Sequence, residues 1–237
     1  MPSRDVAQVE AETRDYYRAR ADEFEDWYRR RGSYQHGPEA DAAWNRELGE
    51  MERFIEPLRD STILEVAAGT GWWTRRLAPR NRVIATDYAP EMIACARRLA
   101  DPSDDVERCR ADAYRLPVAE GAVDACFFGF WLSHVPVSRA VEFMREARRV
   151  VRPGGELWLL DSAQSRTSGH QGQRVVGQRV QQQRRNLKDG SVYDIWKIYW
   201  SPLDLRFLFG LVCDRVEVAI TEQYFVMARG RVAGSST

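Results

Sequence analysis

The stretch ILEVAAGTGWWT, residues 63–74, decides the fold of this chain. An apolar segment with one acid leads into two small residues, a Gly-Thr-Gly triplet and two tryptophans. The apolar segment is typical of a buried β-strand, and the glycines predict a tight turn because they adopt backbone angles that other residues avoid. A turn with almost no side chains, placed before a helix, lets another molecule approach the backbone. The stretch therefore indicates a ligand site.

Apolar strands and helical segments alternate from this turn onward. The expected strands cover 62–67, 82–87, 106–112, 122–130 and 156–162. Helices are expected after Gly71, from Pro90 onward and over 138–152, where Arg152-Pro-Gly-Gly155 indicates a stop. This alternation predicts a mostly parallel sheet with helices on both faces.

The segments before and after this region follow other patterns. A helical cap is expected over 1–57, with helices at 5–31 and 39–56. The sheet domain is expected over 58–232, with a flexible tail at 233–237. Its insertion, 163–200, is predicted to hold a polar, solvated lid over 163–188 and a hairpin around the Asp189-Gly190 turn dipeptide.

The C-terminal part is expected to complete the sheet. A short helix is predicted to begin at Ser201, and 214–222 and 223–232 are predicted to form an antiparallel pair at one side. The expected fold is therefore an α/β protein with a seven-stranded, mostly parallel sheet, an antiparallel strand at one edge and an N-terminal helical cap.

The composition excludes several classes of partner. The 237 residues carry 35 basic and 35 acidic side chains, so bulk attraction to nucleic acid or to an anionic membrane is not expected. No apolar run reaches the roughly 18 residues that a membrane span needs, and the N-terminus has no apolar signal segment. The four cysteines show no metal-ligand spacing. We expect a cytoplasmic protein with reduced thiols and no metal.

The neighbouring strand supplies a second part of the ligand site. Asp87 ends it, 18 residues after Gly69, where nucleotide-binding sheets place an acid that accepts hydrogen bonds from ribose; a helix cap is the alternative role. A dinucleotide site favours a third glycine, but Thr74 occupies that position. The charge of Glu65 would repel phosphate and attract an ammonium group. The pattern favours S-adenosylmethionine, an adenosine with an amino-acid tail.

Residues 62–162 resemble the class I (Rossmann-like) S-adenosylmethionine-dependent methyltransferases. Glu65-Val-Ala-Ala-Gly-Thr-Gly71 is similar to the first motif of that family, with Ala67 where a glycine is often found. Further likenesses follow in the family's order at Asp87, Arg110-Ala-Asp-Ala113, Phe128-Gly-Phe-Trp-Leu-Ser-His-Val135 and Arg152-Pro-Gly-Gly-Glu156. The resemblance implies these cofactor-binding residues: Glu65, Ala67, Gly69, Gly71, Asp87, Tyr88, Met92, Asp112, Ala113, Phe128 and Gly129.

The resemblance also implies a reaction. A methyl group would pass to an O, N, S or C nucleophile of a small molecule, such as one of secondary metabolism, and S-adenosylhomocysteine would leave. Two alternatives stay open: an RNA or protein methyltransferase that uses the Arg-rich insertion, and a module that binds the cofactor without transferring a methyl group. An NAD(P)-linked oxidoreductase is disfavoured by Thr74. A homodimer is left open.

Several side chains are candidates for the acceptor side. His134 follows the fourth strand and is predicted to act as a general base or to orient the acceptor, with packing as the alternative. His36 is the second candidate catalytic residue and would close over the cofactor from the cap, with a turn residue as the alternative. Trp131, Tyr16 and Tyr28 are candidate acceptor contacts, although an aromatic face such as that of the first helix more often serves core packing, and packing fits Trp131 equally well.

Overall fold

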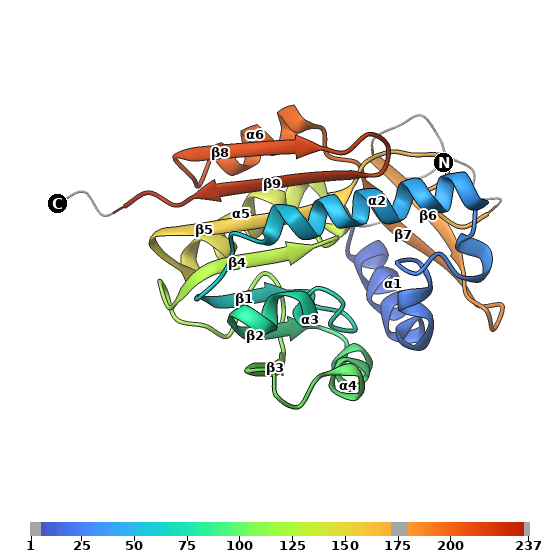
Figure 1. The fold of residues 1–237 in the computed structure, drawn as a ribbon, viewed down its shortest axis with the longest axis horizontal. Helices are drawn as coiled ribbons and strands as arrows, with labels where there is room; N and C mark the ends of the chain where they lie inside the picture. The colour runs from blue at the N-terminus through green and yellow to red at the C-terminus, as the bar shows by residue number, and fades with distance from the viewer. Residues whose placement is uncertain (1–5, 172–179, 235–237) are drawn as a thin grey trace.

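The computed structural model describes residues 6–171 and 180–234 (Figure 1). Within them, seven strands form one sheet in the order β3-β2-β1-β4-β5-β9-β8. Their bounds are β1 Thr62–Val66, β2 Arg82–Asp87, β3 Val106–Arg110, β4 Val123–Gly129, β5 Val151–Ser162, β8 Arg215–Ile220 and β9 Phe225–Arg231. Strand β9 runs antiparallel to β5 and to the edge strand β8. The predicted fold is confirmed, except that the antiparallel strand lies second from the edge.

Helices cover both faces of the sheet. Helix α2 (Pro38–Ile55) crosses one face in Figure 1 and packs with α3 (Thr74–Leu77), the single helical turn after the glycine triplet. The opposite face packs against α5 (Val137–Val150) and α6 (Pro202–Gly210). Helix α4 (Pro90–Leu99) follows β2 and begins with its proline, as predicted. No helix of the described residues is long and apolar enough to span a membrane.

The N-terminal segment is more broken than its aromatic spacing predicts. The expected helix 5–31 divides into α1 (Val6–Ala19) and the 3-10 helix η1 (Ala21–Asp26), followed by η2 (Gly32–Tyr34). Tyr16 of α1 packs on the hairpin, whereas Phe24 of η1 packs on the start of α4. One straight helix could not bury both side chains, so tertiary packing outweighs the local pattern. The division into cap and sheet domain stays a prediction.

The Pro-Gly-Gly segment follows the end of the helix, as predicted, but it is itself part of the next strand. Helix α5 ends at Val150 and β5 begins at once, so Arg152–Gly155 lies inside the strand, beside an irregularity in the pairing of β4 with β5. A Cβ added at Gly155 would lie 2.4 Å from the carbonyl oxygen of Asp124. The glycine therefore permits a close approach of two strands.

The hairpin after the main sheet is confirmed and longer than predicted. Strands β6 (Val180–Asn186) and β7 (Val192–Ile198) pair antiparallel around the Asp189-Gly190 turn. Strand β6 occupies part of the stretch predicted as a solvated lid, because cross-strand bonds to β7 give its polar sequence a partner. Residues 172–179 of that predicted lid lie outside the described residues.

Candidate active site

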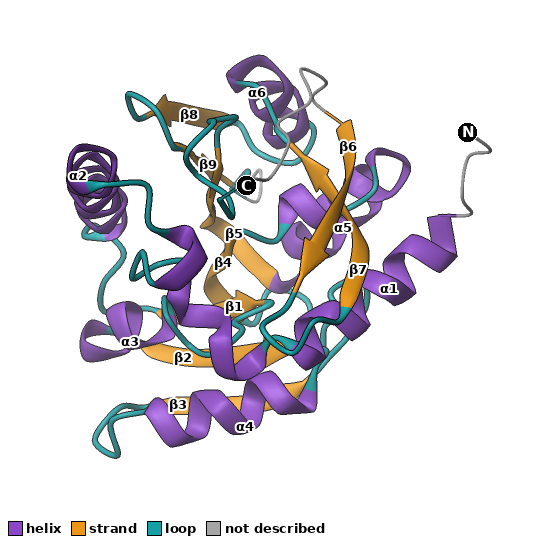
Figure 2. Ribbon diagram, turned by 90° about the vertical axis from the view of Figure 1, so that its right-hand side faces the viewer, coloured by secondary structure: helices purple, strands orange, loops and turns teal. Residues whose placement is uncertain are grey.

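A cavity opens at the carboxyl ends of β1, β2 and β4, where parallel sheets bind ligands. Its other walls come from α1 and η1, from the β6–β7 hairpin and from the segment that follows β5. Figure 2 views the molecule from the side on which α1 and the hairpin lie. The cavity is therefore enclosed between the carboxyl ends of these strands and the covering segments, which come from α1, η1, the hairpin and the chain after β5.

The glycine turn after β1 presents backbone to this cavity. Ala67, Gly69 and Gly71 all have positive φ angles, of 54°, 58° and 78°. A glycine fits at position 69 because it has no side chain: an added Cβ would lie 3.2 Å from the ring of Phe24 in η1. Ala67 adopts a conformation that favours glycine, which explains why its position in the first motif is often a glycine.

The two tryptophans of the opening stretch turn away from the cavity. Trp72 stacks on the ring of Tyr28 with centroids 4.4 Å apart, and the indole N–H of Trp73 donates to the Tyr28 hydroxyl at 3.2 Å. Both indoles are at least 94% buried in the core under α2, and the described cavity lining includes neither. Bulky residues thus follow the turn without blocking its backbone.

Asp87 joins the ends of β1 and β2. One carboxylate oxygen accepts the Gly69 N–H and the other accepts the Ala89 N–H, each at 2.8 Å. Burial raises the pKa of Asp87 to about 6, although these N–H groups lower it. A carboxylate has about four acceptor sites, so two stay available for a ribose diol. The residue fits the predicted role without being the N-cap of α4, which is Ala89.

Glu65 lies beneath the turn instead of in the cavity. Its side chain is 2% exposed and accepts a hydrogen bond from the Thr74 hydroxyl at 2.6 Å. Burial raises the pKa of Glu65 to about 8, so the group is mainly neutral at pH 7. The expected attraction of an ammonium group by its charge is therefore not supported; the carboxyl holds Thr74 and the turn in place.

The other predicted cofactor residues divide into two sets. Phe128 and Gly71 do not belong to the described lining; Phe128 is fully buried against Phe143. The backbone N–H of Tyr114 donates to Asp112 at 2.9 Å and orients that carboxylate at the cavity wall. The predicted cofactor residues that line the cavity are Ala67, Gly69, Asp87, Tyr88, Met92, Asp112, Ala113 and Gly129.

His134 lies in the cavity wall and forms two hydrogen bonds. Its Nδ1 lies 2.7 Å from the carbonyl oxygen of Trp196, and because a carbonyl only accepts, Nδ1 carries the proton. Its Nε2 then accepts from the Tyr17 hydroxyl at 2.7 Å. Burial, and next the ammonium of Lys197, hold the pKa of His134 well below its usual value. The imidazole is therefore neutral.

Lys197 of β7 lies beside His134, buried among polar groups. Its ammonium donates to the hydroxyls of Ser133 and Ser162 at 2.8 and 3.1 Å, and Asp161 lies 3.6 Å away. Burial lowers the pKa of Lys197 to about 8, and nearby Arg185 adds to this lowering. Sequence reasoning missed this residue, although a lysine in an apolar alternating strand of a chain with two lysines is a usable signal.

The remaining predicted acceptor-side residues lie in two different places. Trp131, Tyr16 and Tyr28 line the cavity, together with Tyr17 and Arg20, which sequence analysis did not assign to the site. The aromatic spacing of α1 indicated a buried face, but only the fold places part of that face over the carboxyl ends of the strands.

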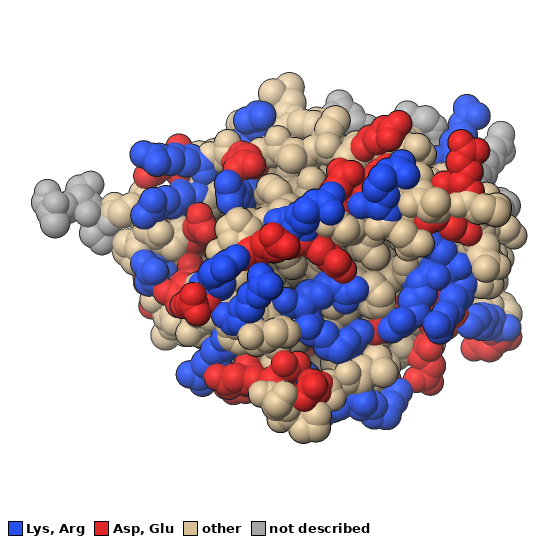
Figure 3. Space-filling model, in the orientation of Figure 1, with Lys and Arg blue, Asp and Glu red and all other residues tan. Residues whose placement is uncertain are grey.

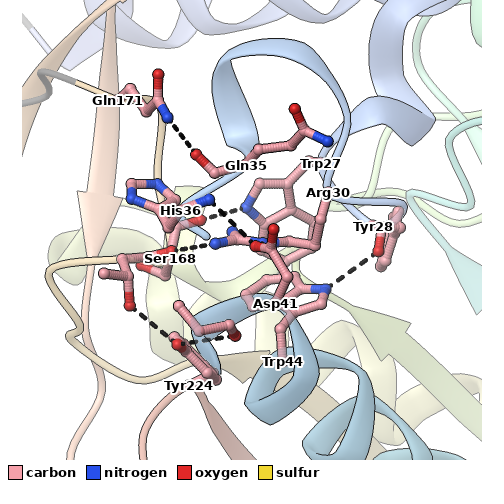
Figure 4. Close-up of polar contacts among 12 residues, drawn as sticks. Trp27, Tyr28, Arg30, Gln35, His36, Asp41, Trp44, Ser168, Gln171 and Tyr224 are labelled. Carbon is pink, nitrogen blue, oxygen red and sulfur yellow. Dashed lines mark hydrogen bonds and ion pairs between the residues drawn. The ribbon is translucent and has the colours of Figure 1, made fainter. Parts of the chain in front are cut away.

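His36 has a different position. Figure 4 shows it in a network between the N-terminal segment and the segment after β5, where its Nε2 lies 2.8 Å from the carbonyl oxygen of Gly169. The described lining of the cavity does not include it. The network also holds the Trp27 indole N–H on the Ser168 carbonyl and Arg30 on Asp41. His36 connects the covering segments, and this position does not support its predicted catalytic role.

Comparison with known proteins extends this picture. Residues 63–155 match a family model described as a methyltransferase domain. A demethylmenaquinone methyltransferase from Thermus thermophilus is 34% identical over 126 residues, which are 52% of this chain and 55% of that protein. One from Listeria welshimeri is 28% identical over 132 residues, 53% and 54% of the two chains. The match thus spans about half the length of these curated relatives.

Solved structures match over nearly the whole chain. DhpI in complex with SAM and HEP is 31% identical over 93% of this chain and 96% of its own, with a TM-score of 0.72. A complex of DhpI with SAH is 29% identical and covers 98% and 100% of the two chains, with a TM-score of 0.73. The likeness therefore includes the N-terminal segment and the hairpin as well as the sheet. This chain belongs to the class I S-adenosylmethionine-dependent methyltransferases.

Proposed function

We propose that this protein transfers the methyl group of S-adenosylmethionine to a nucleophilic atom of a small molecule bound in the cavity. The observation that carries the proposal is the continuity of the cavity. It joins the residues at the ends of β1 and β2, such as Gly69 and Asp87, to a covered end lined by Tyr17, His134 and Lys197. Donor and acceptor could therefore share one enclosed space.

The residues at the carboxyl ends of β1 and β2 fit the cofactor. The turn offers backbone without side chains, and Asp87 keeps acceptor sites for a ribose diol. When bound, S-adenosylmethionine supplies a methyl group that an acceptor atom takes as the C–S bond breaks and its electron pair stays on sulfur. The protein then mainly has to align the acceptor and exclude water. Phe24 suits the second task because its ring covers Gly69.

Tyr17 and His134 are proposed to orient the acceptor. The neutral imidazole keeps its Nε2 lone pair directed at the Tyr17 hydroxyl, so an acceptor hydroxyl could join or replace this contact. His134 would take a proton from an acceptor that has to lose one. Its lowered pKa makes it a weak base while the cavity holds no acceptor.

The partners and location follow from the same considerations. On the face drawn in Figure 3, basic and acidic side chains are interspersed, which supports a small-molecule acceptor over a nucleic acid. The four cysteines are free thiols, a pattern that supports a cytoplasmic location. The names of the relatives agree with a small acceptor, but they do not identify the acceptor of this chain.

Calorimetry with S-adenosylhomocysteine tests the cofactor part of the proposal. Asp87→Ala should weaken binding by about 1–3 kcal/mol, because charge-assisted hydrogen bonds are lost. Affinity of the parent protein should also fall below pH about 6, where the Asp87 carboxylate takes up a proton. Asp101→Ala, an exposed carboxylate beyond α4, is the control and should bind like the parent.

The result that contradicts this part is equal affinity of the Asp87 variant and the parent, or tighter binding of NAD or ATP than of S-adenosylhomocysteine. Transfer itself is tested by S-adenosylhomocysteine release in the presence of candidate acceptors. A protein that binds the donor tightly but releases no product with any of them would be the non-transferring module.

A further inference from the structure

The covered end of the cavity gathers cations from three elements that are distant in sequence. Arg20 follows α1, Arg185 lies on β6 and Lys197 on β7, and all three line the cavity. Each of them lowers the pKa of His134, which places all three within electrostatic reach of one imidazole. The cluster is a property of the fold, because no two of its members are neighbours in the sequence.

Arg20 is a buried cation that has no direct acidic partner among the described residues. Its side chain is 8% exposed, and the guanidinium lies over the rings of Tyr16, Phe24 and Tyr34 at 5.1–5.7 Å from their centroids. Across the described residues, its guanidinium has no hydrogen-bond or ion-pair partner, and its Nε is fully enclosed. Glu23 of η1 acts on Arg20 only through its field.

Surface arginines of the same region behave differently. Arg29 binds Glu25 at 2.8 Å, and Arg98 binds Asp22 at 2.9 Å. Burying an unpaired charge is costly, so a buried cation normally has an acidic partner or a ligand. Because a guanidinium presents five N–H donors and stays charged, Arg20 offers a fork that matches an oxyanion.

The other two cations of this end of the cavity have polar partners of their own. The ammonium of Lys197 is shared between two serine hydroxyls and Asp161, and Arg185 donates to the Gln183 amide oxygen at 2.7 Å. Arg20 and Arg185 both contribute to lowering the pKa of His134 and of Lys197, and Asp161 acts on Lys197 in the opposite direction. Arg20 is thus the cation of this end of the cavity that has no direct acidic partner among the described residues.

We propose that the methyl acceptor is a small acid whose anionic group, a carboxylate or a phosphate-type oxyanion, binds Arg20 at the covered end of the cavity. This inference rests on the proposed methyl transfer and names the chemical class of the acceptor. The aromatic rings around Arg20 exclude water, so the charge-assisted bonds to the anion form in surroundings of low polarity.

Binding of the anion would also change the neighbouring base. His134 faces Tyr17 and Arg20 from the N-terminal segment, Lys197 and Arg185 from the hairpin and, through Lys197, Asp161 of β5. Neutralising part of the positive field raises the pKa of His134, because the cations are among the causes that lower it. The acceptor would thus strengthen the base that takes its proton.

The first test uses simple anions. With S-adenosylhomocysteine bound at saturation, inorganic phosphate and acetate are titrated while the ring signals of the three histidines are followed by NMR. Either anion should raise the pH at the midpoint of the His134 titration. The anion that binds more tightly identifies the type of acid. Arg20→Met should weaken binding of that anion by at least about tenfold, whereas Arg29→Met, in the same segment but outside the cavity, should bind like the parent.

A second test uses turnover and depends less on the stability of the variants. Glycolate and phosphoglycolate are each compared with the neutral glycolamide, and S-adenosylhomocysteine release is measured. Release only with an acid supports the proposal. Release with the amide alone, or no anion effect on His134 in a protein that binds S-adenosylhomocysteine, overturns it. Failure to bind S-adenosylhomocysteine at all would instead count against the proposed function.

Discussion

At the scale of single residues, burial decides what the titratable groups of this protein can do. Glu65 and Asp87 end up on opposite sides of the same turn, one under it and one at its open edge. Asp87 keeps acceptor sites directed at the cavity, whereas Glu65 is enclosed, uncharged at pH 7 and bonded to Thr74. The sequence marks both as acids beside a turn, but solvent access separates a binding group from a structural one.

This difference predicts the pH dependence of stability. The folded pKa of Glu65, about 8, lies above its ordinary value of 4.5, so its stabilising contribution is present below pH 4.5 and is lost as the pH rises through about 8. The free energy of unfolding should fall by about 3–5 kcal/mol over this window. Glu65→Gln should remove most of this slope in denaturant titrations from pH 5 to 9. An unchanged slope in the variant would show that other groups produce it.

At the scale of elements, the close approach of β4 to the segment after the glycine turn explains why β4 ends with a glycine. Gly129 ends β4, and an added Cβ there would lie 2.7 Å from Cδ1 of Trp73. Trp73 in turn donates to the Tyr28 hydroxyl and is held in the core beside the turn. The glycine of the fourth-strand motif therefore makes room for a tryptophan that follows the first motif.

Gly129→Ala should consequently lower the free energy of unfolding by about 1–3 kcal/mol through overpacking. Gly210→Ala is the matched control, since no atom lies within 4 Å of its added Cβ at the end of α6, and it should be neutral or slightly stabilising. Thermal or denaturant unfolding measures both. If the two substitutions had the same effect, the contact with Trp73 would not be the cause.

At the scale of the whole molecule, two segments from opposite parts of the chain cover the cavity together. The Trp27 indole and the Arg30 guanidinium donate to the carbonyls of Ser168 and Thr167 at 2.7 and 2.8 Å, and the Gln171 N–H donates to the Ser33 carbonyl at 2.7 Å. The N-terminal segment and the segment after β5 thus form one covering layer over the carboxyl ends of the strands.

Hydrogen exchange should detect this connection. S-adenosylhomocysteine is expected to slow exchange in 6–36 and in 163–171 by similar factors, because the contacts of Trp27, Arg30 and Ser33 with 167–171 require that the two segments open together. The β8–β9 edge, on the far side of β5, should exchange at an unchanged rate. Slowing confined to the glycine turn would mean that the two segments move independently of the ligand.

The amino-acid sequence by itself determined the alternating sheet, the glycine turn and Asp87, because these depend on hydrophobic periodicity and on backbone conformations that only a few residue types adopt. It did not determine the break of the first helix, the entry of β5 directly after α5, or the position of His36. Only the tertiary structure decided the acceptor end, where Arg20 and Lys197 meet His134 although 177 positions separate the two cations. Such a cluster leaves no local pattern, since its energy depends on burial and on charges that become neighbours only when the chain has folded.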